Sequence, residues 1–164
     1  MIGRRDIIHD PEAVCRAVST TLPPGSALTV ATHNRALTVL EAAIVPPVEF
    51  AAHGFPTEIV RISLIADTEA PIAVPVGPGR DWCHRYLDLD NGGLYGQLCL
   101  WYPSDPPHLR WTWDNGFESF VHLVLRHLIF EEHWRRNGTW PGHEAPHGHQ
   151  ADGSPHPVPP ELAA

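Results

Sequence analysis

Apolar and polar residues recur with helical spacing near the start of the chain and again in its last third, with strand-like segments between. Residues 10–20 predict a first helix, because apolar positions share one face, Asp10 suits the N-cap and Pro11 suits the first helical position. The run 23–25, Pro-Pro-Gly, ends this helix.

Extended segments follow the first helix. Residues 26–32 and 57–66 are rich in β-branched residues and predict strands. Residues 36–44 fit either a strand or a helix by pattern, and two prolines end this segment in both cases. Three prolines between positions 71 and 78 exclude a central strand and predict an extended edge segment or a loop.

A long amphipathic helix is predicted over residues 117–136. Asn115 and Glu118 resemble a capping box, and Asn137-Gly138 fits a left-handed C-terminal cap. Its apolar face comprises Phe117, Phe120, Val121, Val124, Leu128 and Ile129. The order of helix, strands, irregular segment and long helix predicts an α+β fold with an antiparallel sheet.

Composition narrows the class of protein. The chain has 164 residues and a formal net charge of −8, with no basic run, which argues against binding to nucleic acid or an anionic membrane. No apolar stretch approaches the roughly 18 residues of a membrane-spanning helix, and no signal-peptide pattern is visible, so a cytoplasmic location is expected. Residues 1–149 are expected to form one domain, and the Pro-, Gly- and His-rich residues 150–164 a disordered tail.

The three cysteines are the first candidates for chemistry. Their odd number and the absence of a CxxC pair predict free thiols. Cys15 falls on the first helix and is expected to pack there, and Cys83 is also interpreted as structural. Cys99 lies in an irregular segment between a glycine-rich turn and a proline, where a thiol nucleophile could be reached, although a packing role is open on the local pattern. His84 could approach Cys99 across the fold.

Histidines near the C-terminus are candidates for metal binding. His143, His147 and His149 could supply nitrogen ligands with Glu144 as an oxygen ligand. Pro146 excludes the helical HExxH arrangement, and a solvated His-rich tail is the preferred interpretation. No metal or cofactor is therefore expected.

An ordered set of motifs in residues 84–148 resembles the prokaryotic ubiquitin-conjugating-enzyme-like family of bacterial ubiquitin-like conjugation operons and CBASS antiviral operons. The matching residues are His84 and Tyr86, the run Leu98-Cys99-Leu100-Trp101-Tyr102-Pro103, Trp111 and Trp113, the helix 117–136, Gly138-Thr139-Trp140-Pro141-Gly142, and His147-Gly148. The resemblance implies a ubiquitin-conjugating-enzyme-like fold, and it covers less than half of the chain.

The resemblance also implies an acyltransferase activity. Cys99 would form a thioester with the C-terminus of a ubiquitin-like protein or a CBASS nucleotidyltransferase, with or without a separate activating enzyme, and pass the acyl group to an acceptor. Leu98, Leu100, Trp101, Tyr102 and Pro103 would form the active-site loop, with His84, Tyr86 and Asn91 as auxiliary residues. Eukaryotic relatives carry His-Pro-Asn where this chain has His84-Arg85-Tyr86, so oxyanion support from His84, Asn91 or backbone N–H groups stays open.

Two other functions are compatible with the sequence. The first is a partner-binding module that has the same fold and performs no chemistry, which the departure from His-Pro-Asn and the six Trp residues favour. The second is a metal-dependent hydrolase that uses the C-terminal histidines.

The absence of lysine generates a prediction. Lysine amines near a reactive thioester would invite self-acylation, and the chain carries 11 basic residues, all Arg. Replacing Arg85 or Arg110 with Lys in the presence of an acyl donor should create a self-adduct that survives thiol treatment, detectable by mass spectrometry. If no such adduct forms, the lysine-free composition reflects codon usage alone.

Overall fold

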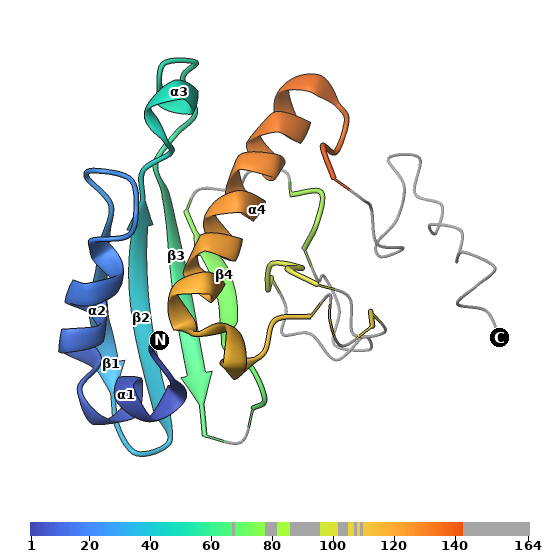
Figure 1. Ribbon diagram of the computed structural model, residues 1–164. Coiled ribbons are helices and arrows are strands. Elements are labelled where there is room, and N and C mark those ends of the chain that lie inside the picture. The colour runs from blue at the N-terminus through green and yellow to red at the C-terminus, as the bar shows by residue number, and fades with distance from the viewer. Residues whose placement is uncertain are drawn as a thin grey trace, which may run out of the picture.

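A four-stranded antiparallel sheet covered on one face by helices forms the body of the computed structural model (Figure 1). Its strands are β1 (Ala27–His33), β2 (Leu37–Ile44), β3 (Glu58–Ile65) and β4 (Ile72–Val76), in the spatial order β1-β2-β3-β4. The structure describes residues 1–66, 68–77, 82–85, 96–101, 105–106, 108 and 110–142. The tail predicted at residues 150–164 lies outside these residues.

Strand β2 was the ambiguous segment of the sequence, and its neighbours explain why it is extended. It pairs along its length with both β1 and β3, and every second residue from Thr38 to Ile44 is buried. The β1–β2 turn is closed by Asn34, whose Oδ1 accepts hydrogen bonds from the N–H groups of Ala36 and Leu37. Strand β4, which contains Pro75, lies at an edge of the sheet, as the prolines of this region predict.

Among the described residues, four α-helices accompany the sheet. They are α1 (Arg4–His9), α2 (Pro11–Ser19), α3 (Val48–Ala51) and α4 (Phe117–Asn137). The prediction for α2 is confirmed, including its cap, because the Asp10 side chain accepts a hydrogen bond of 2.9 Å from the N–H of Ala13. The short helices α1 and α3 were not predicted.

The start of α4 differs from the predicted capping box. Gly116 is the N-cap, and Asn115 ends a 3-10 helix, Trp113–Asn115, that precedes it. The Asn115 side chain closes that turn by accepting a hydrogen bond of 2.8 Å from the N–H of Thr112. Glu118 accepts one from the N–H of Ile2, which ties the N-terminus to the start of α4. The prediction was wrong because both polar side chains have other partners.

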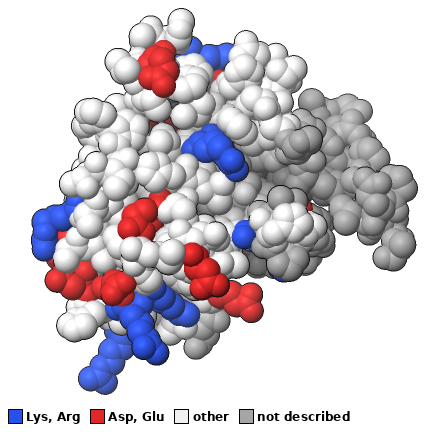
Figure 2. Space-filling view, viewed as in Figure 1, with Lys and Arg blue, Asp and Glu red and all other residues white. Residues whose placement is uncertain are grey.

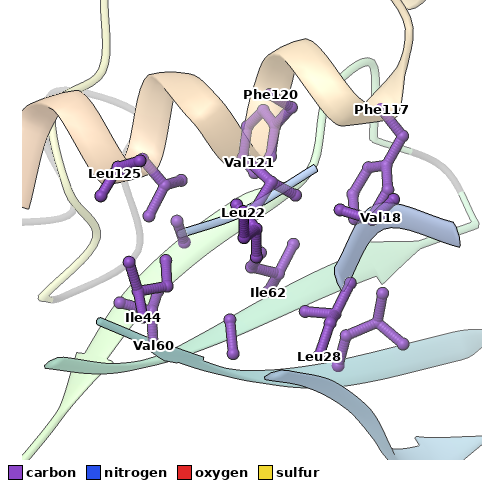
Figure 3. Close-up of a cluster of buried hydrophobic side chains, with 14 of the residues drawn as sticks. Val18, Leu22, Leu28, Ile44, Val60, Ile62, Phe117, Phe120, Val121 and Leu125 are labelled. Carbon is purple, nitrogen blue, oxygen red and sulfur yellow. The ribbon is translucent and has the colours of Figure 1, made fainter. Parts of the chain in front are cut away.

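The hydrophobic core lies between the helices and the sheet. Figure 3 shows side chains of α4 pointing toward those of the strands, with residues from α2 and the segment after it at their side. The labelled members are Val18, Leu22, Leu28, Ile44, Val60, Ile62, Phe117, Phe120, Val121 and Leu125. The predicted apolar face of α4 is therefore the face that packs on the sheet.

The C-terminal end of α4 is anchored to the connection between β2 and β3. Arg136 donates hydrogen bonds to the carbonyl oxygens of His53 and Gly54, and its guanidinium lies 4.5 Å from the ring centroid of Phe55. Gly138 has a left-handed conformation (φ 69°) and ends the helix as predicted. Contacts at both ends thus fix α4 across the sheet.

The observed elements confirm an α+β fold with an antiparallel sheet and a long C-terminal helix. Within the described part of the chain, no helix combines the length and apolar character needed to cross a bilayer.

The core generates a stability prediction. Phe120 is fully buried between α4 and the sheet, so Phe120→Ala should lower the free energy of unfolding by about 3–5 kcal/mol in urea denaturation. Ile59, on the other face of β3, is 39% exposed, and Ile59→Ala should cost less than about 1 kcal/mol. Equal losses in the two variants would contradict this placement of the core.

Candidate functional site

The segment that contains Cys99 runs beside residues 82–85 and is joined to the edge of the sheet. An antiparallel bridge pairs Arg85 with Leu98, and the Leu98 N–H donates a hydrogen bond of 2.8 Å to the carbonyl oxygen of Ala73 in β4. Gly96 begins this segment with φ 86°, and a Cβ there would clash with the Arg85 guanidinium. The glycine thus allows Arg85 to bond the Gly96 carbonyl oxygen at 2.8 Å.

Two hydrogen bonds hold Cys99 in place. Its N–H donates a hydrogen bond of 3.0 Å to the carbonyl oxygen of His84, and its thiol donates one of 3.6 Å to the carbonyl oxygen of Trp101. The residue is 6% exposed. The structure therefore places His84 and Cys99 side by side through their backbones, and Cys99 is buried.

A buried carboxylate on α4 holds the backbone next to Cys99. Glu131 is 0% exposed, and its two oxygens accept hydrogen bonds of 2.8 Å and 2.7 Å from the N–H groups of Cys83 and His84. Charge-assisted hydrogen bonds of this length are among the strong ones, and they compensate for the removal of the charge from water. Residues 83 and 84 are thereby fixed to the helix.

His127, one turn before Glu131, bonds the same backbone. Its Nε2 lies 3.0 Å from the carbonyl oxygen of His84 and 3.3 Å from Oε1 of Glu131. Because a carbonyl oxygen only accepts, Nε2 carries the hydrogen. The His84 carbonyl oxygen thus accepts hydrogen bonds from both His127 and Cys99, while the His84 N–H is bonded to Glu131.

The Gly-x-Trp-Pro-Gly motif returns the chain to this site after α4. The ring of Trp140 stacks on that of His84 with centroids 3.9 Å apart, and it meets the rings of His127 and Phe130 edge-on. Gly142 lies so close to Phe130 that a Cβ would be 3.0 Å from its ring. The stack covers one face of the buried His84 imidazole.

A second group of aromatic rings includes Trp101, which lies two residues after Cys99. Trp101 packs with Trp111 and Phe120 at centroid distances of 6.5 Å and 6.2 Å, and the indole N–H of Trp111 donates a hydrogen bond of 2.8 Å to Ser119. Figure 2 shows Arg side chains gathered beside acidic ones at the lower edge of the face in view, with single charged side chains elsewhere among the described residues. The segment that follows Cys99 therefore packs among aromatic rings.

The structure covers only part of the predicted site. His84, Leu98, Cys99, Leu100 and Trp101 come together in it. Tyr86, Asn91, Tyr102 and Pro103 lie outside the described residues.

Backbone N–H groups were one of the proposed sources of oxyanion support. Those of Leu98, Cys99 and Leu100 are engaged with the carbonyl oxygens of Ala73, His84 and Leu98. A thioester on Cys99 in this conformation would have to draw oxyanion donors from elsewhere.

The other two cysteines differ from Cys99 in their surroundings. Cys15 is buried on α2, and burial, with a smaller contribution from Glu12, raises the pKa of its thiol to about 11 despite the opposing charge of Arg16. Cys15 is therefore a neutral thiol near pH 7 and fits the predicted packing role. Cys83 is half-buried, and its backbone N–H donates a hydrogen bond to Glu131.

Two residues of the site, His127 and Glu131, were not identified from the sequence. Both fall on the apolar side of α4, three residues after Val124 and Leu128 respectively. A carboxylate and an imidazole at core positions of an amphipathic helix are a signal for buried partners, and this signal is visible in the sequence.

The metal hypothesis has no support in the described part of the chain, where no group of three or more His, Cys, Asp or Glu side chains could hold an ion. His143, Glu144, His147 and His149, on which that hypothesis depends, lie outside it.

The bonds of Glu131 generate a stability prediction. Glu131→Ala leaves the N–H groups of Cys83 and His84 without their acceptor, so the free energy of unfolding should fall by about 3 kcal/mol or more in urea denaturation. Glu132→Ala removes ion pairs with Arg135 and Arg136, whose side chains stay partly exposed at 14% and 37%, and should cost less, about 1 kcal/mol. A smaller loss in Glu131→Ala than in Glu132→Ala would contradict this account.

Comparisons of the chain with models of protein families, with curated proteins and with solved structures find no match in any of the three.

Proposed function

We propose that the chain is a ubiquitin-conjugating-like acyltransferase with Cys99 as its thioester-forming cysteine. The observation that carries the proposal is the meeting of motif residues that are far apart in the sequence. His84, Cys99 and Trp140 are joined by a hydrogen bond of 3.0 Å and a ring stack of 3.9 Å. The motifs resemble one family in their order along the chain, and the folded chain brings them into one site. Chance matches of separate short motifs would give no reason for them to meet.

The arrangement of elements also supports the proposal. An N-terminal helical region, a four-stranded antiparallel meander, the cysteine segment and a long helix follow one another in the order expected of a ubiquitin-conjugating-enzyme-like fold. An α+β fold with an antiparallel sheet is also compatible with other functions.

The chemistry begins with the thiolate of Cys99. It attacks the carbonyl carbon of an activated C-terminal glycine, a new C–S bond forms, and the thiol or nucleotide that activated the glycine departs. An amine or another acceptor then attacks the thioester, the C–S bond breaks and the thiol is restored. The donor would be a ubiquitin-like protein or a CBASS nucleotidyltransferase, activated by a separate enzyme or supplied directly, in cytoplasmic antiviral defence.

The burial of the thiol sets a condition on this reaction. Because Cys99 is 6% exposed, a donor's C-terminus would reach Sγ only if neighbouring residues move aside during docking. A covered thioester is in turn protected from hydrolysis until an acceptor arrives.

A covalent adduct with the donor tests the proposal. Incubation with the products of the neighbouring genes and ATP should give a thiol-sensitive adduct on non-reducing gels, and Cys99→Ala should abolish it. Cys15→Ala and Cys83→Ala should retain the adduct, because neither is the proposed acceptor. Persistence of the adduct in Cys99→Ala would overturn the proposal.

A non-catalytic binding module is the second candidate, and the covered thiol favours it. In that case the aromatic surroundings of Cys99 would bind a partner, and Cys99→Ser would keep full activity in a phage-protection assay. The acyltransferase proposal requires that activity to be lost.

A further inference from the structure

Helix α4 carries two polar side chains into the interior, and the proposed acyl transfer gives neither of them a role. Glu131 and His127 are both buried, and their hydrogen bonds go to the backbone of residues 83 and 84. Buried polar groups of this kind are costly unless they are fully bonded, so they need an explanation beyond the packing of the helix.

We propose that Glu131 and His127 are positioning residues for Cys99, which act through the peptide groups of His84. Oε1 of Glu131 accepts the His84 N–H at 2.7 Å, and Nε2 of His127 donates to the His84 carbonyl oxygen at 3.0 Å. The same carbonyl oxygen accepts the Cys99 N–H at 3.0 Å. The backbone of Cys99 is thereby linked to the rigid helix through the two peptide groups on either side of the His84 Cα. The proposal rests on the proposed function of Cys99.

The position of Sγ should affect two reactions of the Cys99 thiol, acylation and alkylation, to different degrees. Acyl transfer requires Sγ to approach a carbonyl carbon from one direction while negative charge develops on the oxygen, so errors of orientation are costly. Alkylation by a small neutral reagent needs access to Sγ but no oxyanion support. Loss of positioning should therefore slow acylation more than alkylation, whereas simple loosening of the structure should change both rates by the same factor.

Glu131→Gln is the informative substitution. The amide has the shape of the carboxylate, but only one of its two polar atoms accepts hydrogen bonds, so one of the two backbone N–H groups loses its acceptor. Glu132→Gln is the matched control, because it makes the same chemical change at the next position of α4, where the side chain bonds Arg135 and Arg136 instead.

The experiment compares the rates of the two reactions at Cys99 alone. In a Cys15→Ala/Cys83→Ala background, mass spectrometry follows alkylation by iodoacetamide and acylation by the glycyl thioester of mercaptoethanesulfonate. In the acylation, the Cys99 thiolate attacks the glycyl carbonyl, a new C–S bond forms, and the mercaptoethanesulfonate thiolate leaves. Glu131→Gln should lower the ratio of acylation to alkylation by at least about tenfold, and Glu132→Gln should leave it unchanged.

A second pair of variants keeps the proposal testable where Glu131→Gln does not fold, as judged by circular dichroism. His127→Leu removes the donor to the His84 carbonyl oxygen and should lower the same ratio. His127→Gln retains an N–H donor and should restore part of it.

The outcomes separate the two proposals. If Glu131→Gln and His127→Leu change both rates by one common factor, or neither rate, the positioning proposal is wrong and the two residues only stabilise the fold. If Cys99 is alkylated but never acylated in the background protein, the acyl-acceptor function itself is wrong.

Discussion

The bonding of one buried carboxylate to two consecutive backbone N–H groups connects the helix layer to the cysteine segment. Glu131 comes from the face of α4 that packs on the sheet, so its charge lies in the interior and must be compensated there. The N–H groups of Cys83 and His84 supply that compensation. The position of the cysteine segment therefore depends on the position of α4. The aromatic core and the contacts at both helix ends determine where α4 lies.

Periodicity was sufficient to predict most of the elements that form the core. The helices α2 and α4 and the strands β1 and β3 each carry enough apolar residues at a regular spacing to be recognised. Segments that depend on distant contacts were harder. Helix α3 has four residues and none of them is buried, so its segment carries no amphipathic pattern. The ambiguity of β2 was resolved only by its pairing on both sides.

The motif residues of the candidate site could be chosen from the sequence, whereas the partners of its buried helix residues could not. Cys99, His84 and Trp140 could be chosen because each belongs to a motif. Glu131 and His127 bond peptide groups, and a peptide N–H or carbonyl leaves no trace in the identity of the residue that carries it. The capping prediction at Asn115 failed for a related reason, since its side chain had a closer backbone partner.

The two edges of the sheet differ from its centre in a way that affects how other chains can approach. The ladder of β1 is interrupted between Val30 and Thr32, and β4 contains Pro75, which has no N–H to donate, while its Ala73 carbonyl oxygen is already bonded to Leu98. Interrupted or occupied edges resist the addition of a further strand and the aggregation that follows from it. A protein that docks on this molecule would therefore do so through side chains and surface shape, not by extending the sheet.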